Sequence, residues 1–321
     1  MTRKSIYGSS TIISILVSSL CFLVMGCHRG DRSVVYDSPS NGTIHISVDE
    51  SFEPVISEHI KMYESTYPGT RIIAQYKPEA DCFRDLLKDS SNRMIIATRG
   101  LNDREERYFM DSLNYVPVWN DVASDAITII VNSKSTDTLF TMERLKKQLS
   151  GGMTGLPQQA KRQTIVFDGL NATSTVRFAM DSILRGGHFD TSVVKAVKTS
   201  HDVLEYVASD INAIGFVGIS WIGNPEDTAQ VNMLKKVKMA YVQCDKCEDS
   251  PYVKPTQSGI LSNRYPLVRG LYYIVKENYT GLGSGFANFL QYERGQLIFR
   301  RAYLGARMGF AIRNVRIKEK L

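Results

Sequence analysis

Short apolar runs alternate with amphipathic helical stretches along most of this chain. Residues 42–49 place Ile44, Ile46 and Val48 at every second position, which is the period of a β-strand with one buried face. Residues 51–69 instead repeat apolar side chains at intervals of three and four, and a Pro-Gly pair ends that helix. The alternation continues to one long amphipathic helix predicted at residues 281–307. It predicts an α/β fold with mainly parallel sheets flanked by helices.

The length of the chain, 321 residues, is sufficient for two lobes of ordinary domain size. Long β runs at residues 125–132 and 270–276 flank a central block, and we expect them to form a hinge of two crossing segments. We therefore predict lobe 1 at residues 43–132 and 263–321 and lobe 2 at residues 133–262. Each lobe is expected to have its own sheet.

The N-terminus has the pattern of a secretory signal. Two basic residues precede an uncharged stretch at residues 11–25, which is shorter than the roughly 20 apolar residues of a membrane span. It ends in Leu-Val-Met-Gly-Cys, which resembles a bacterial lipobox and implies lipidation of Cys27 once residues 1–26 are removed. An uncleaved N-terminal anchor is the alternative. Both interpretations predict a protein of the cell envelope that faces the periplasm, with residues 27–41 as a flexible tether.

Three cysteines remain after the predicted signal and lipidation site. Cys244 and Cys247 form a CxxC motif without a second CxxC or a nearby pair of histidines, a pattern that does not favour zinc. In an oxidising compartment it favours a small loop disulfide, which leaves Cys82 free. A redox-active pair and a metal site are the open alternatives.

Signatures of catalysis and of nucleic-acid binding are weak. The sequence has no Gly-x-Ser-x-Gly elbow, P-loop or His-Glu-x-x-His motif, and His59 lies on the apolar face of its predicted helix, as a core residue would. The net charge of +6 is too small for a nucleic-acid binder. We interpret the basic and aromatic tract at residues 265–279 as a β run with snorkelling Lys and Arg. We therefore expect no enzyme, no cofactor, no metal and no nucleic-acid partner.

Five short motifs occur in an order typical of one protein family. They are SVDESFEP, IIATRGLNDREE, DGLNATSTVRF, AIGFVGISWI and FANFLQYERGQLIFRRAYLGAR. With the order of elements across residues 42–309, they resemble the PstS-type phosphate-binding proteins of ABC importers. The resemblance implies the two-lobe type II periplasmic-binding-protein fold, phosphate bound between the lobes and delivery to an ABC permease.

The resemblance also implies site residues at two turns. Ser51 and Phe52 match a Thr/Ser-Phe pair that offers backbone and hydroxyl donors to phosphate. Asn171, Ala172 and Thr173 match a Ser-Gly-Thr turn, of which the threonine is retained. Free N–H groups at a helix start favour such an anion. Ordinary capping of a helix, with Asn171 as the N-cap, is the alternative for the second turn.

Charged residues near these turns depart from the family pattern. Phe167 stands where well-known members have an Arg, and Arg99 lies near the place of an Asp that often accepts the proton of hydrogen phosphate. We therefore predict Arg99 and Arg177 as charge-assisted donors and Asp168 as an acceptor for a monoprotonated ligand. Surface or ion-paired arginines are the alternative for both Arg99 and Arg177.

Together these patterns predict a lipid-anchored solute-binding protein. It would capture phosphate or a related small oxyanion in a cleft between two lobes and deliver it to an ABC importer. The departures at the site favour a second interpretation on the same fold, in which the protein senses a ligand or docks to another envelope complex.

Overall fold

The structure is a computed structural model that describes residues 37–152, 155, 158, 163–169 and 172–309. The predicted signal peptide, Cys27 and Asn171 lie outside these residues. Within them, ten strands form one hydrogen-bonded sheet in the order β2-β1-β3-β12-β4-β8-β6-β7, with β9 and β13 paired to β4. The ten strands are β1 (Asn41–Asp49), β2 (Gly69–Lys77), β3 (Asn92–Ala97), β4 (Val118–Asn132), β6 (Thr164–Phe167), β7 (Val194–Ala196), β8 (Ala213–Gly218), β9 (Val237–Met239), β12 (Val268–Val275) and β13 (Gly305–Ala306). A small second sheet contains β5 (Leu139–Phe140), β10 (Tyr241–Gln243) and β11 (Tyr252–Val253).

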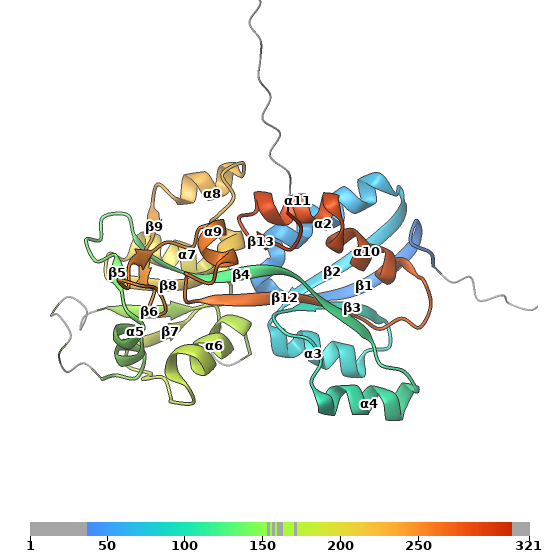
Figure 1. Ribbon diagram of the computed structural model, residues 1–321, viewed down its shortest axis with the longest axis horizontal. Helices are drawn as coiled ribbons and strands as arrows, with labels where there is room; N and C mark the ends of the chain where they lie inside the picture. The colour runs from blue at the N-terminus through green and yellow to red at the C-terminus, as the bar shows by residue number, and fades with distance from the viewer. Residues whose placement is uncertain (1–36, 153–154, 156–157, 159–162, 170–171, 310–321) are drawn as a thin grey trace, which may run out of the picture. The chain divides into compact units, whose positions relative to one another are not determined.

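Each end of the large sheet has a set of parallel strands. β1 pairs in parallel with β2 and β3, and β6 pairs in parallel with β7 and β8. Between the sets, β12 and β4 are antiparallel to each other, and Figure 1 shows them crossing the centre of the fold side by side. The predicted α/β class is confirmed. The expected separate sheets, however, are joined into one, because β4 pairs with β12 on one side and with β8 on the other.

β4 is longer than the sequence predicts. Its residues up to Ala126 pair with β12, and those from Ile127 to Val131 pair with β8. The predicted run at residues 125–132 is therefore only the second half of this strand. We retain the division into two lobes as a proposal, in which β4 and β12 are the crossing segments. Lobe 1 would contain the β1–β3 set, and lobe 2 the β6–β8 set.

Helices lie between the strands, as the alternation predicts. They are α2 (Glu53–Thr66), α3 (Glu79–Lys88), α4 (Asp103–Leu113), α5 (Met142–Leu149), α6 (Ser174–Phe178), α7 (Ser200–Ser209), α8 (Thr228–Met233), α9 (Gln257–Leu261), α10 (Leu282–Gln291) and α11 (Glu293–Arg301). Two short 3₁₀ turns, η1 (Glu50–Phe52) and η4 (Ile219–Trp221), follow β1 and β8, and a π-helical segment, η3 (Ala179–Leu184), extends α6. The starts of α2 and α6 are the two turns that the sequence assigns to the site.

The long helix predicted at residues 281–307 is in fact two helices. α10 and α11 are separated at Tyr292, whose ψ of 175° is extended. A β-carbon at Gly295 would lie 2.1 Å from the carbonyl oxygen of Phe289, so α11 packs on the end of α10 at a distance that only glycine permits. Apolar periodicity did not reveal the break, because it continues on both sides of Tyr292.

His59 occupies the hydrophobic core, as its position on an apolar helix face predicted. Its side chain is fully buried, and its ring centroid lies 4.2 Å from that of Phe299. Both ring nitrogens lie within 3 Å of carbonyl oxygens, those of Val55 and Gly295. Burial lowers the pKa of His59 to about 4, so the imidazole is neutral at physiological pH.

The cysteines adopt the first of the predicted arrangements. Cys244 and Cys247 form a disulfide beside β10, and Cys82 is a free, buried thiol whose pKa is raised by burial. Among the described residues, no helix combines the length and the apolar composition needed to cross a membrane.

Candidate functional site

Two turns from opposite sets of strands meet at a buried point between them. Ser51 lies in η1 after β1, and its Oγ is 3.2 Å from Oγ of Ser174 and 3.4 Å from Oγ1 of Thr175, at the start of α6. The Ser51 carbonyl accepts a hydrogen bond of 2.8 Å from the Ser220 hydroxyl in η4. Phe52 is fully buried beside them. The structure thus places the predicted Ser51-Phe52 turn directly against the hydroxyl-rich turn.

Arg269 is the charged group at this point, and the sequence interpretation missed it. Its side chain is only 3% exposed; Nε donates to Oδ2 of Asp125 at 2.7 Å, and Nη1 donates to Oγ of Ser174 at 2.7 Å. Nη2 has no hydrogen-bond partner among the described residues. The reading of this tract as a snorkelling β run is wrong for Arg269. Its alternation with the buried Leu271 and Tyr273 was the available signal for an inward-facing side chain.

Three buried carboxyl groups surround the guanidinium. Burial raises the pKa of Asp49 to about 7, with a further rise from Glu79. Burial also raises the pKa of Asp125 and that of Asp168, against the opposing effects of Arg269 and of neighbouring donors. Oδ2 of Asp49 and Oδ1 of Asp125 have no partner among the described residues. We call this group the Arg269 cluster: Asp49, Ser51, Asp125, Asp168, Ser174, Thr175 and Arg269.

A further acid lies at the edge of the Arg269 cluster. Glu50 accepts hydrogen bonds of 2.8 Å from both N and Oγ of Ser200, the first residue of α7. Burial raises the pKa of Glu50 to about 8, and the nearby Asp168 adds to the rise. The site therefore contains several buried carboxyl groups with raised pKa values and one guanidinium whose Nη2 has no partner among the described residues.

The turn before α6 differs in register from the prediction. The N-cap is Thr173, not Asn171, and the helix begins at Ser174. The Thr173 hydroxyl accepts from the Val176 N–H at 3.4 Å and donates to Oδ1 of Asp168 at 2.9 Å. Thr175 donates to the other oxygen of Asp168 at 3.1 Å. Thr173 therefore caps a helix, and Asp168 holds the turn in place through two hydroxyls.

The two predicted arginines are both engaged in ion pairs. Arg99 binds Glu105 through two contacts of 2.8 Å and stacks on the ring of Phe83. Arg177 binds Glu79 through Nε at 2.7 Å. Both line a cavity of about 400 Å³ together with the predicted Ala172 and Thr173, while Ser51, Phe52 and Asp168 lie in or beside the Arg269 cluster. Thr173 belongs to both places, because it lines the cavity and bonds Asp168.

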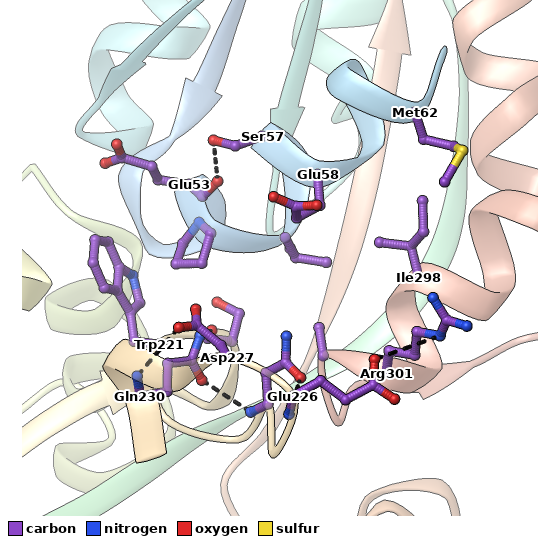
Figure 2. A pocket seen from close by; sticks show the side chains of 15 residues that line it. Glu53, Ser57, Glu58, Met62, Trp221, Glu226, Asp227, Gln230, Ile298 and Arg301 are labelled. Carbon is purple, nitrogen blue, oxygen red and sulfur yellow. Dashed lines mark hydrogen bonds and ion pairs between the residues drawn. The ribbon is translucent and has the colours of Figure 1, made fainter. Parts of the chain in front are cut away.

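A larger pocket of about 570 Å³ lies between α2 and the η4–α8 segment, next to α11. Figure 2 shows Glu53 and Glu58 on one wall facing Glu226 and Asp227 on the other. The cation that lines it, Arg301, is 3.9 Å from Glu226. Because these walls are predominantly acidic, this pocket disfavours a small anion despite its size. The Arg269 cluster and its adjoining cavity are the better candidates.

Comparison with known families and structures supports the same fold. A family model described as a PBP superfamily domain matches residues 34–294, and no curated protein matches the sequence. The chain is similar to a candidate phosphate ABC transporter substrate-binding protein with bound phosphate from Clostridium perfringens, with a TM-score of 0.64 and 19% identity over 82% of this chain and 98% of that one.

Two further solved structures are similar. One is an ABC-type phosphate transport receptor from Vibrio cholerae, with a TM-score of 0.58 and 18% identity over 81% of this chain and 98% of that one. The other is PstS from Borrelia burgdorferi, with a TM-score of 0.51 and 19% identity over 83% and 99%. At these identities the likeness establishes the fold.

Proposed function

The chain belongs to the PBP superfamily and has the type II periplasmic-binding-protein fold, and from this premise we propose that it is a solute-binding protein for phosphate or a related small oxyanion. The ligand would bind between the two lobes, at the Arg269 cluster, and a hinge motion of the crossing segments β4 and β12 would close the lobes around it.

The observation that carries this proposal is Nη2 of Arg269, which is buried and has no hydrogen-bond partner within the described ranges. A buried guanidinium N–H without an acceptor is rare in folded proteins and is favourable only when a ligand or water supplies one. The Ser174 hydroxyl accepts from the neighbouring Nη1 and lies 3.2 Å from the hydroxyl of Ser51, and either of these serine hydroxyls can donate a hydrogen bond to a ligand. Together they form a donor set suited to the oxygens of a small tetrahedral anion.

The surrounding carboxyl groups favour a ligand that carries a proton. Asp49 and Asp125 each have an oxygen that no described residue contacts by a hydrogen bond, and this oxygen can accept one from a ligand hydroxyl. Hydrogen phosphate and hydrogen arsenate have such a hydroxyl at neutral pH, whereas sulfate has none. We therefore infer that the site favours phosphate and arsenate over sulfate, because sulfate would leave these acceptors unpaired and opposed to its charge.

The proposal also covers where the protein is located and which partner receives the ligand. The lipobox-like Cys27 supports a lipid anchor in the cell envelope, and two structurally similar proteins are described as a phosphate ABC transporter substrate-binding protein and an ABC-type phosphate transport receptor. We propose an ABC permease as the partner that receives the ligand.

Calorimetric titration of the whole protein, purified in detergent and dialysed free of anions, tests the function. We expect binding heat with phosphate and arsenate and at least tenfold weaker binding of sulfate. Circular dichroism would establish that the sample is folded. A folded, ligand-free protein that shows no heat with any of the three anions would rule out the anion-binding function.

A second function on the same fold is favoured by one specific observation. Arg99 and Arg177, the arginines predicted to bind the ligand, are instead paired with Glu105 and Glu79. A protein that senses a ligand or docks to another envelope complex would not need these side chains for anion capture. Absence of anion binding together with capture of an envelope complex other than a permease would support this alternative.

A further inference from the structure

A set of polar contacts connects the two proposed lobes at the edge of the 400 Å³ cavity. Arg177 lies on α6 in lobe 2, whereas Glu79 begins α3 and Thr98 follows β3 in lobe 1. Arg177 donates from Nε to Oε2 of Glu79 at 2.7 Å and from Nη2 to Oε1 at 3.2 Å. Nη2 also donates to the hydroxyl of Thr98, which in turn donates to Oε1 of Glu79.

Glu79 is held in place on the lobe 1 side of these contacts. The residue is only 3% exposed, and its Oε1 accepts from the backbone N–H of Thr98 at 2.9 Å. A backbone hydrogen bond of 3.0 Å from Ala80 N to Ala172 O crosses between the lobes beside it. Arg177 approaches from lobe 2 as a side chain that is 40% exposed, and its Nη1 is also 3.5 Å from Asp181 on its own helix. Arg177 can therefore leave Glu79 and keep an acidic neighbour.

We propose that Glu79, Thr98 and Arg177 form a clamp that holds the two lobes closed and sets the equilibrium between open and closed forms in the absence of ligand. Glu79 and Arg177 of the clamp line the cavity together with Thr173, which contacts the Arg269 cluster through Asp168. The clamp would therefore have to open before a ligand can enter between the lobes. This inference rests on the proposed two-lobe function and concerns how the opening of the lobes is regulated.

The energetic weight of the clamp follows from its chemistry. Hydrogen bonds to ionised groups are stronger than neutral ones, and Glu79 is largely removed from water while the lobes are closed. In an open form, water hydrates Arg177 and Glu79 again. The clamp therefore stabilises the closed form only by the difference between the free energy of the ion pair and that of the two hydrated side chains. A shift of about tenfold in the open-to-closed ratio is therefore the expected scale for loss of one charged member.

The test measures the open fraction by double electron–electron resonance, without any ligand. Spin labels would be placed by Ser112→Cys on α4 in lobe 1 and Thr191→Cys before β7 in lobe 2, both at exposed positions. Of the cysteines in the described residues, Cys82 is buried and the other two form a disulfide, so none of these three offers an exposed thiol to the label. Cys21 and Cys27 lie in the predicted signal peptide and at the predicted lipidation site. We expect Glu79→Gln to raise the ratio of open to closed protein about tenfold or more. Thr98→Val removes a neutral partner and should shift the ratio in the same direction by less.

Arg99→Gln is the matched control. Arg99 lines the same cavity and forms an equally short ion pair, but its partner Glu105 belongs to the same lobe. The control should leave the distance distribution unchanged. In an Arg177→Gln background, Glu79→Gln should change the ratio much less than it does alone, because the pair is already lost.

The clamp would be refuted if the distance distributions of the Glu79→Gln and Thr98→Val variants match that of the parent. Equal shifts in the Arg99→Gln control would refute it too, since the effect would then be general loosening. Thermal unfolding of each variant would establish that it is folded. Because no anion is added, the result does not depend on phosphate binding, and the failure of either proposal can be recognised separately.

Discussion

Arg269 uses two of its nitrogens to bind the protein, and its third has no partner in the part of the chain that the structure describes. The contact with Asp125 is structural, since each group would otherwise be a buried charge without its counter-ion. The free Nη2 is the part available to a ligand. One side chain thus has a structural and a proposed binding role, and the two can be separated by mutation.

Arg269→Gln should lower the free energy of unfolding by about 3–5 kcal/mol, because Asp125 is left buried and unpaired. The double variant with Asp125→Asn should recover much of that loss, since a neutral pair replaces the ion pair. Phosphate affinity should remain lost in both variants, because the guanidinium is absent. Chemical denaturation and calorimetry would measure the two effects. Recovery of phosphate affinity in the double variant would contradict the binding role.

The break between α10 and α11 shows how one residue decides the course of an element. Gly295 permits α11 to approach the carbonyl end of α10, and its own carbonyl oxygen lies 2.9 Å from the buried His59. The helices therefore fold back on lobe 1 instead of continuing as one rod. Sequence periodicity alone favours the rod, because both helices present apolar faces.

Gly295→Ala tests this packing. A β-carbon there would meet the Phe289 carbonyl oxygen at 2.1 Å, so α11 must shift, and we expect a loss of about 1–3 kcal/mol in the free energy of unfolding. Gly309→Ala is the control, since a β-carbon at that position has no neighbour within 4 Å among the residues that the structure describes. Similar stability of both variants, measured by urea denaturation, would show that the close approach is not needed.

The burial of acidic side chains between the two proposed lobes makes the stability of the whole molecule depend on pH. Burial raises the pKa of Glu50 to about 8 and that of Asp49 to about 7, from ordinary values of 4.5 and 3.8. The folded form therefore binds more protons at these groups than the unfolded form does. Their contribution to stability is fully present below the ordinary values and is lost as pH rises through the raised ones. His59 has the opposite effect, but only below its ordinary value of 6.5.

The free energy of unfolding should consequently fall as pH rises from 6.5 to 8, the range in which the effect of Glu50 and Asp49 outweighs the declining effect of His59. Denaturant titrations at several pH values in this range would measure the slope. Glu50→Gln should flatten it, whereas Glu143→Gln, at an exposed helix position, should not. A parent protein whose stability is constant or rises across this range would contradict the raised pKa values.

Much of the fold was predictable because its causes are local. The alternation of Ile44, Ile46 and Val48 and the periodicity around His59 depend on residues a few positions apart, and the structure confirms both elements. The disulfide between Cys244 and Cys247 is local in the same sense. The turns that contain Ser51 and Thr173 were assigned to the site by their resemblance to family motifs, and the fold brings these turns together, although the N-cap of α6 is Thr173 and not Asn171.

The partners of the charged groups could be known only from the tertiary structure. Arg269 and Asp125 are 144 positions apart, and Arg177 and Glu79 are 98 apart, so no local pattern relates them. Arg269 is buried beside Asp125 because β12 lies beside β4 in the sheet. Arg177 pairs with Glu79 because the start of α6 lies near the start of α3. Local propensity specifies strands, helices and caps, because backbone hydrogen bonding and side-chain periodicity act over a few residues. Electrostatic pairing in the site follows from strand order, because only the folded sheet brings distant charges within a few ångströms of one another.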